Sequence, residues 1–242
     1  MAYALTDGTV GFKQLTPYNL SDTTARHLPG RIAQAVDPYW GGGEFIYVKA
    51  GGSIRQFGIV VITPSIASGQ AVYTATEVPN TANLGRMVGI ATVSAASGDY
   101  LWAQIGGLTP VNCSASVAAD TAFGIAAAGQ GGAIANGKQL VNARVMIAAA
   151  ATVAKAGCTA NSGSTKLRVP NADGWFAGAY LSGTGIAAAT TVSDIDPSGT
   201  VVTLSAATTA AVAGTVTATY NNATVYYNVA HINRPFAQGQ VV

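Results

Sequence analysis

The chain has 242 residues, enough for one large β domain or two smaller ones around a buried core. Only 9% of its residues are charged, against about 25% in an average globular domain, and 29 residues are glycine. The 12 basic and 10 acidic residues form no basic cluster, so we expect no nucleic-acid partner. A surface with so little charge suits a protein that lies against other proteins, because large uncharged surfaces tend to associate.

Neither a membrane segment nor a secretion signal is expected. The first residues lack a basic stretch followed by an apolar one, and the longest apolar run, Met146–Ala154, is too short to span a bilayer. The two cysteines, Cys113 and Cys158, lack metal-ligand spacing. We therefore expect buried thiols and not a disulfide.

Residues 1–43 are predicted to form an extended N-terminal arm that orders against a partner. Pro17, Pro29 and Pro38, the glycines at 41–43 and many Thr, Ser and Asn residues leave no sustained apolar alternation. The alternative is a disordered tail. The many apolar residues of this segment favour the arm over the tail.

Residues 44–151 are predicted to form the main β domain, a compact barrel or sandwich. No apolar pattern keeps helical spacing for more than two turns, and short β-branched or aromatic runs are cut by Gly, Pro and Asn. The run Ala148–Thr152 fits either a helix or a strand. The strands predicted for the whole chain are 44–49, 56–63, 71–77, 87–92, 100–105, 109–113, 139–148, 167–169, 179–181, 190–195, 200–204, 214–220 and 224–232.

The stretch 91–111 places an acid and two aromatic residues between glycine turns. Tyr100 and Trp102 share one strand face, and Asp99 lies in the turn before them, where its side chain can cap backbone donors. We predict a second turn at Gly106–Gly107. The stretch therefore indicates a β-meander and not an active site.

Two segments resemble nucleotide-binding motifs only superficially. Gly132–Gln139 matches a phosphate-binding loop but has Gln139 where magnesium binding needs Ser or Thr, and a strand follows it. Its Asn136–Gly137 pair predicts the turn of a hairpin instead. Gly183–Ala188 resembles a dinucleotide motif but lies outside any βαβ unit. No cofactor is expected.

Residues 152–222 are predicted to form a small, separate β-sandwich module rich in Thr, Ala, Gly and Val. Asp196–Gly199 reads as a turn that joins two strands. Asp194 and Asp196 are expected to be solvated turn carboxylates, since a calcium site would need further oxygen ligands. The aromatic-rich segment 223–242 is expected to return to the main domain.

No motif points to catalysis. The chain contains two histidines, His27 and His231, and two glutamates, Glu44 and Glu77, none of them within a recognisable catalytic pattern. We expect neither an enzyme nor a metal site. A glycan hydrolase stays open as an alternative and would need two carboxylates about 5–10 Å apart in a cleft.

The segment GRMVGIATVSAASGDYLWAQIGGLTPV, a Gly/Ala loop and then NGKQLVNARVMIA resemble the capsid decoration proteins of tailed bacteriophages, also called cement or head-stabilising proteins. The preceding GGGEFIYVKAGGS, residues 41–53, belongs to the same pattern. The resemblance covers roughly residues 30–150 and is one of strands and turns. More weakly, VSDIDPSGTVVTLSAA is similar to the immunoglobulin-like add-on modules of virion surfaces.

The resemblance implies a structural protein that is made in the host cytoplasm and binds the outer surface of an assembled capsid. Its expected partners are the major capsid protein and copies of itself, as a homotrimer or else a dimer. No catalytic residue is carried over. The alternative is a tail-fibre or head-fibre accessory protein that binds host glycans, with exposed aromatics around Trp175 and Phe176 as its mark. The residues of the arm expected to bind the capsid are Phe12, Lys13, Tyr18, Arg26, Arg31, Tyr39 and Trp40.

Overall fold

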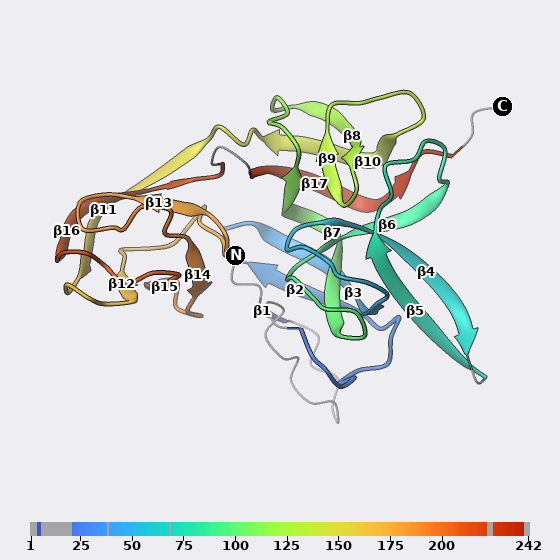
Figure 1. Cartoon of the computed structure of the whole chain (residues 1–242), viewed down its shortest axis with the longest axis horizontal. Coiled ribbons are helices and arrows are strands. Elements are labelled where there is room, and N and C mark those ends of the chain that lie inside the picture. Colours follow the sequence, from blue (N-terminus) through green and yellow to red (C-terminus); the bar gives the residue numbers. More distant parts are fainter. Residues whose placement is uncertain (1–3, 6–20, 38, 68, 222–224, 240–242) are drawn as a thin grey trace. The chain divides into compact units, whose positions relative to one another are not determined.

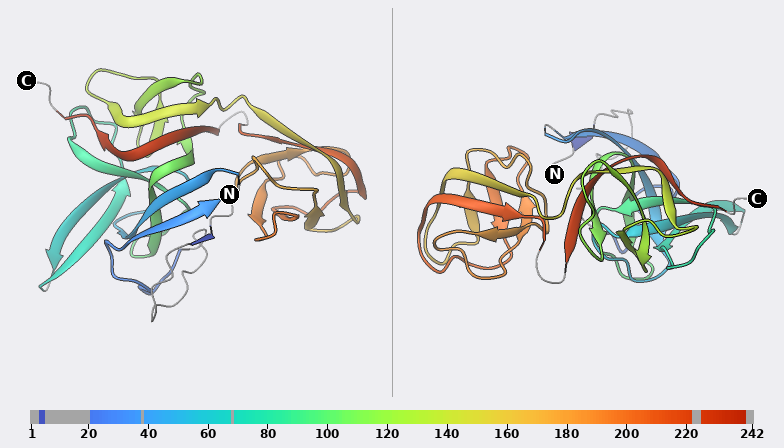
Figure 2. Two further views of the ribbon diagram at one scale, coloured as in Figure 1. Left: turned by 180° about the vertical axis from the view of Figure 1, so that it is seen from behind. Right: turned by 90° about the horizontal axis from the view of Figure 1, so that it is seen from above.

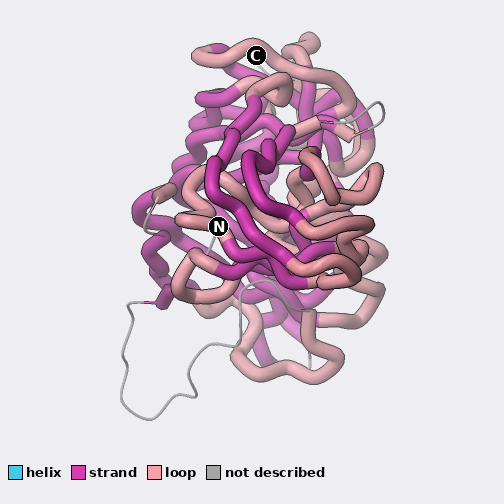
Figure 3. Tube along the Cα trace, turned by 90° about the vertical axis from the view of Figure 1, so that its left-hand side faces the viewer, coloured by secondary structure: helices cyan, strands magenta, loops and turns pink. Residues whose placement is uncertain are grey.

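The protein is built from strands and loops. The computed structural model describes residues 4–5, 21–37, 39–67, 69–221 and 225–239. Strands dominate these ranges and helices are absent from them (Figure 3), which confirms the all-β prediction. Accordingly, none of these residues belongs to a helix that could cross a membrane.

The chain divides into two compact units. The larger unit consists of Leu5–Val36, Gly41–Ala148 and Val225–Val242, and the smaller one of Met1–Ala4, Asp37–Trp40 and Ala149–Thr224. The stretch predicted as a separate module, 152–222, lies inside the last of these segments. The predicted main domain, 44–151, falls almost entirely in the larger unit, to which the chain returns at Val225.

The larger sheet has 11 strands. They are β1 (Ala4–Leu5), β2 (Ile32–Asp37), β3 (Gly41–Ala50), β4 (Ile59–Ala67), β5 (Gln70–Glu77), β6 (Arg86–Ala91), β7 (Tyr100–Cys113), β8 (Thr121–Ala127), β9 (Gln130–Gly132), β10 (Gln139–Ile147) and β17 (Tyr226–Ala237). Their order is β1-β2-β3-β5-β4-β6-β17-β10-β8-β9-β7, and β7 also pairs with β3, β6 and β17. Two segments of the range predicted as an arm, 32–37 and 41–43, thus lie in strands β2 and β3.

These additional pairings of β7 bend the sheet into two rings (Figure 1). The first ring contains β3, β5, β4, β6 and the first half of β7. The second contains the second half of β7 with β9, β8, β10 and β17. Strand β7 is therefore shared by both rings.

The two rings have the same connectivity. In each, the first strand pairs in parallel with the third and antiparallel with the fifth, and the remaining pairs are antiparallel. The sequence repeats with them: Phe57–Ile59 and Phe123–Ile125 both read FGI, and the following hairpins both turn at Gly-Gln, Gly69–Gln70 and Gly129–Gln130. Both turn glycines have positive φ angles.

The prediction of a turn at Gly106–Gly107 is wrong, because β7 passes through these residues without interruption. Gly106 faces Glu44 of β3 and Asn233 of β17, on the two sides of β7. Gly107 has a φ of +94°, and a Cβ atom there would lie 2.3 Å from the carbonyl oxygen of Gly42. The two glycines thus permit close contact between strands and do not end the strand.

An ion pair crosses β7 at Gly106 and joins the two rings. The Arg234 guanidinium of β17 donates to both carboxylate oxygens of Glu44 on β3, at 2.8 and 3.0 Å. These hydrogen bonds lower the pKa of Glu44. Because Gly106 has no side chain, it leaves room for the pair above the strand.

The first ring encloses an apolar core. Its members come from all five strands and from the loops between them: Ile46, Val48, Ala50, Ile54, Val60, Ile62, Ala75, Ala91, Ala95, Leu101, Ala103 and Ile105. In the second ring, Cys113 and Phe123 are fully buried, and both lie close to Gly131. Burial raises the pKa of the Cys113 thiol to about 12. Cys113 and Cys158 are both buried and unpaired, as predicted.

The smaller unit contains a six-stranded sheet. Its strands are β11 (Thr152–Ala160), β12 (Lys166–Arg168), β13 (Tyr180–Ser182), β14 (Val192–Ile195), β15 (Val201–Leu204) and β16 (Val212–Thr219). They follow the order β13-β16-β11-β12-β15-β14, and a bridge between Tyr180 and Thr191 links the two ends. The core contains Trp175, Phe176 and Tyr220, with the rings of Phe176 and Tyr220 4.9 Å apart.

Candidate functional site

Arg26 and Arg31, two residues predicted to bind a capsid, lie beside an aromatic cluster of the first ring. The imidazole of His27 packs against Tyr47 and Trp102, with ring centroids 5.2 and 5.5 Å away. A main-chain bridge between Asp22 and Tyr100 attaches the same segment to β7. Residues 22–31 are therefore held against the first ring by aromatic packing and main-chain hydrogen bonds.

The two arginines of this cluster have partners within the chain. The Nε atom of Arg26 lies 2.7 Å from a carboxylate oxygen of Asp22, and Arg31 lies 3.4 Å from the Nδ1 atom of His27. The Arg26 side chain is more than half exposed, so its outer face is open to a partner. Phe12, Lys13 and Tyr18, which belong to the same prediction, lie outside the described residues.

His27 makes the stability of the larger unit dependent on pH. Burial, followed by the charge of Arg31, lowers the pKa of His27 below its ordinary value of 6.5, Arg26 adds to this, and Asp22 opposes it. The folded chain thus protonates the ring only at a lower pH than the unfolded chain, which takes up the proton near pH 6.5. We expect the free energy of unfolding to be unaffected above that pH and to decrease as the pH falls through it.

The measurement is urea unfolding between about pH 7.5 and pH 5, above the range in which carboxylates titrate. His27→Gln should remove the decrease, and His231→Gln, at an exposed histidine of β17, should leave it in place. An unchanged pH profile in His27→Gln would assign the effect to another group.

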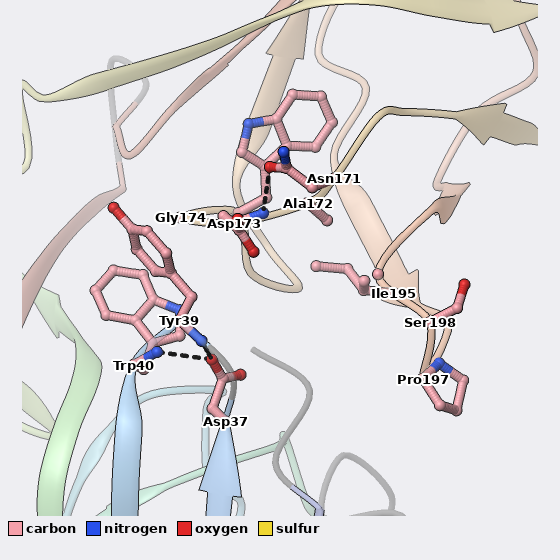
Figure 4. A pocket seen from close by; sticks show the side chains of 12 residues that line it. Asp37, Tyr39, Trp40, Asn171, Ala172, Asp173, Gly174, Ile195, Pro197 and Ser198 are labelled. Carbon is pink, nitrogen blue, oxygen red and sulfur yellow. Dashed lines mark hydrogen bonds between the residues drawn. The ribbon is translucent and has the colours of Figure 1, made fainter.

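Tyr39 and Trp40, the other two predicted residues within the described ranges, line a small cavity of the smaller unit (Figure 4). Their main-chain N–H groups donate to one carboxylate oxygen of Asp37, at 2.8 and 2.7 Å. Tyr39 is half exposed, whereas Trp40 is buried against the chain itself. Of the two rings, only that of Tyr39 is open to a partner.

The cavity is small, and its walls mix aromatic, polar and aliphatic groups. Its volume is about 90 Å³, below the roughly 300 Å³ at which typical ligand pockets begin. The lining residues beyond the Asp37–Trp40 turn are Asn171, Ala172, Asp173, Gly174, Trp175, Ile195, Pro197, Ser198 and Gly199. Asp37 and Asp173 both line this cavity, and one carboxylate oxygen of Asp37 accepts the two main-chain N–H groups described above.

The exposed aromatic side chains that a glycan-binding module would need are not found at Trp175 and Phe176. Trp175 and Phe176 are buried in the core of the smaller unit, with Trp175 only 1% exposed. The indole N–H of Trp175 donates to the carbonyl oxygen of Val153 at 3.0 Å. Neither ring can stack on a sugar in this arrangement. The sequence named these two aromatics only as the mark that the glycan-binding alternative would need, and sequence composition does not distinguish core from surface.

Two of the carboxylates singled out in the sequence, Asp99 and Asp196, stabilise turns, whereas Asp194 lies within strand β14 and pairs with Thr203, so its prediction as a turn residue is wrong. Asp99 accepts a hydrogen bond from the N–H of Ala96, as predicted. Asp196 accepts hydrogen bonds from the N–H groups of Thr200 and Val201 and from the Ser198 hydroxyl, which lowers its pKa. Among the residues that the structure describes, no three His, Cys, Asp or Glu side chains gather as a metal site.

An apolar surface that the sequence analysis missed lies on the larger sheet. Phe236 of β17 pairs with Met87 of β6 on one side and Val141 of β10 on the other. Phe236 and Val141 are 41% and 40% exposed, and Met87 packs against the core of the first ring. We call these three residues the apolar strip. It continues that core onto the surface, where a partner can bury it.

The β4–β5 hairpin forms a second exposed surface of the larger unit. Its outer part extends away from the rest of the sheet in Figure 1 and in the left view of Figure 2. Residues Pro64–Ala67 are all exposed, and Ile66 is 82% exposed. The sequence from Ile59 to Thr76 contains no charged residue. An uncharged ribbon with an exposed apolar tip is a surface for protein contact.

The matching hairpin of the second ring is shorter and is covered by the chain. Its turn residue Gly129 donates to the carbonyl oxygen of Val78 and accepts from the N–H of Ile59, both at 2.9 Å. The Gln130 side chain donates to Asn112 at 2.8 Å. The rings thus differ most at this hairpin, which is docked in the second ring and exposed in the first.

Comparison with models of protein families, with curated proteins and with solved structures found no match to this chain.

Proposed function

We propose that the chain is a structural virion protein that binds the outer surface of a phage capsid and stabilises the assembled head. Its partners are the major capsid protein and further copies of itself, as a homotrimer or a dimer. The proposal includes a barrel-like main domain, an immunoglobulin-like small module and an N-terminal arm that contacts the capsid. The residue and strand pattern of 30–150 supports it by resemblance.

The observation that carries the proposal is the apolar strip. Three apolar side chains lie in register across β6, β17 and β10, in a chain of which 9% is charged. A protein free in solution normally covers such residues with charge, whereas a protein bound to a shell covers them with its partner. The exposed side chains of Arg26 and Tyr39 supply polar contacts at other points of the surface.

The test is binding of the purified chain to undecorated heads, measured by co-sedimentation. We expect saturable binding and heads that withstand a higher temperature. Val141→Glu should weaken binding by about tenfold, equivalent to about 1.4 kcal/mol, because it places a charge in the contact. Thr215→Glu places the same charge at an exposed position of the smaller unit and should leave binding unchanged.

The same assay examines the arm. Removing residues 1–20 spares β2 and every later strand, and it should abolish binding if the arm is the principal contact. Intact binding after this deletion contradicts a principal contact through Phe12, Lys13 and Tyr18 and leaves residues 21–43 as the part of the arm that binds. No saturable binding of the full chain contradicts the proposed function as a whole.

A further inference from the structure

We propose that the outer edge of β5 pairs with the same edge of a second copy about a two-fold axis, which makes the β4–β5 hairpin the self-association site of this chain. The inference rests on the self-association part of the proposed function and is independent of capsid binding. It names the contact surface and its symmetry.

The register of β5 shows which main-chain groups face this edge. The carbonyl oxygen of Ala75 accepts from the N–H of Gly51, so Ala75 directs its main chain away from β4. In an antiparallel pair, alternate residues direct their groups to the same side, which places those of Ala71 on this edge as well. Strand β3 pairs with β5 only at Thr74 and Ala75. Ala71 therefore lies beyond the last strand neighbour on that side within the described residues.

The opposite edge of the hairpin is less suited to pairing. Strand β4 pairs with β6 only from Ile59 to Val61, so its outer part also lacks a strand neighbour among the described residues. However, Pro64 interrupts that part, and proline cannot donate a hydrogen bond to an added strand. Of the two exposed edges, that of β5 is the one without such an interruption.

A second copy of the chain suits the β5 edge because of its charge and symmetry. A two-fold axis at Ala71 places this residue opposite its own copy, so a charge at this position would face the same charge. The hairpin has none between Ile59 and Thr76. The strand continues with Val72, Tyr73 and Thr74, which favour β structure. Natural proteins protect exposed edges with charges or proline, and Gln70–Thr76 of β5 has neither.

The equivalent hairpin of the second ring indicates that the β4–β5 hairpin also needs a partner to cover it. That equivalent hairpin is docked on the first ring of the same chain through main-chain hydrogen bonds of Gly129. The longer hairpin of the first ring has no such cover within the described residues. A trimer would need a contact between two different surfaces, whereas one edge paired with itself produces a dimer.

Disulfide trapping tests the contact directly. In the two-fold pair, the Cα atoms of the two Ala71 residues would lie about 5.5 Å apart, a distance that a disulfide can span. Ala71→Cys should give about tenfold more covalent dimer under oxidising conditions than Ser65→Cys at equal concentration. Ser65 is an exposed residue of β4 in the same hairpin. The native cysteines are buried and do not interfere.

A charge exchange provides an independent measurement. Ala71→Lys and Ala71→Glu should each weaken self-association by about tenfold, because equal charges would face each other, and mixing the two variants should restore it as a heterodimer. The readout is sedimentation velocity of the full chain. Both substitutions are at an exposed position, so the fold is retained.

Equal cross-linking of Ala71→Cys and Ser65→Cys, or a charge pair that does not restore association, overturns the inference. Preferential cross-linking through Ser65→Cys would assign the contact to β4 and overturn it as well. Failure of head binding with intact dimers contradicts only the capsid proposal. Head binding by a chain that never dimerises contradicts only the inference.

Discussion

Gly107→Ala is expected to lower the free energy of unfolding of the larger unit by roughly 3–5 kcal/mol, which is near the upper limit for a single substitution. Gly107 has a φ of +94°, where an L-residue is strained, and its new Cβ atom would lie 2.3 Å from the carbonyl oxygen of Gly42. Neither strand can move without breaking the pairing of β7 with β3 or β17. The measurement is urea unfolding of the full chain.

Gly98→Ala provides the matched control. Gly98 has nearly the same φ, +95°, but no atom lies within 4 Å of its Cβ position. This variant should lose only the conformational contribution, about 1–2 kcal/mol. Equal losses in the two variants would show that the contact with Gly42 carries no energy and that backbone strain accounts for the whole effect.

Trp175→Ala is expected to destabilise the smaller unit by about 3–5 kcal/mol. The side chain is 1% exposed, and its N–H donates to Val153 of β11, so the substitution leaves a cavity and an unpaired carbonyl group. Because the two units have separate cores, unfolding of the larger unit should be unchanged. Hydrogen exchange resolved by residue distinguishes the two units in one experiment.

Trp175→Phe separates packing from hydrogen bonding. It keeps most of the buried ring and loses the bond to Val153, which should cost about 1 kcal/mol for the bond and a smaller packing loss. Faster exchange of the larger unit in Trp175→Ala would contradict the independence of the two cores.

Local sequence rules predicted much of the fold because they depend on neighbouring residues. The turns at Asp99, Gly137 and Asp196 follow from side chains that cap donors and from glycines that adopt positive φ angles. The hairpin predicted at Gly137 is wrong, because β9 and β10 on the two sides of this turn pair with β8 and not with each other. Strand β3 follows from a β-branched and aromatic run. Strands β2, β8, β9 and β11 were missed. In β8, Thr121, Phe123 and Ile125 alternate with small residues, and this local signal was overlooked.

Other features that the sequence did not reveal depend on residues far apart in the chain. Gly106–Gly107 looks like a turn locally, and only the approach of β3 shows why a continuous strand needs glycine there. The apolar strip combines residues from positions 87, 141 and 236, which no sequence window contains. The burial of Trp40 and Trp175 depends equally on tertiary packing. Of the predicted capsid contacts, Arg26, Arg31 and Tyr39 are the described ones with exposed or partly exposed side chains.

Strand β7 has a consequence for how the larger unit opens. Its first half completes one ring and its second half the other, so neither ring can lose this strand without opening its neighbour. The two rings should therefore exchange amide protons as one cooperative unit, with the slowest exchange in β7. Most of its pairings join residues far apart in the chain, and such long-range order slows folding. The chain can complete the second ring only after β17, residues 226–237, has been synthesised.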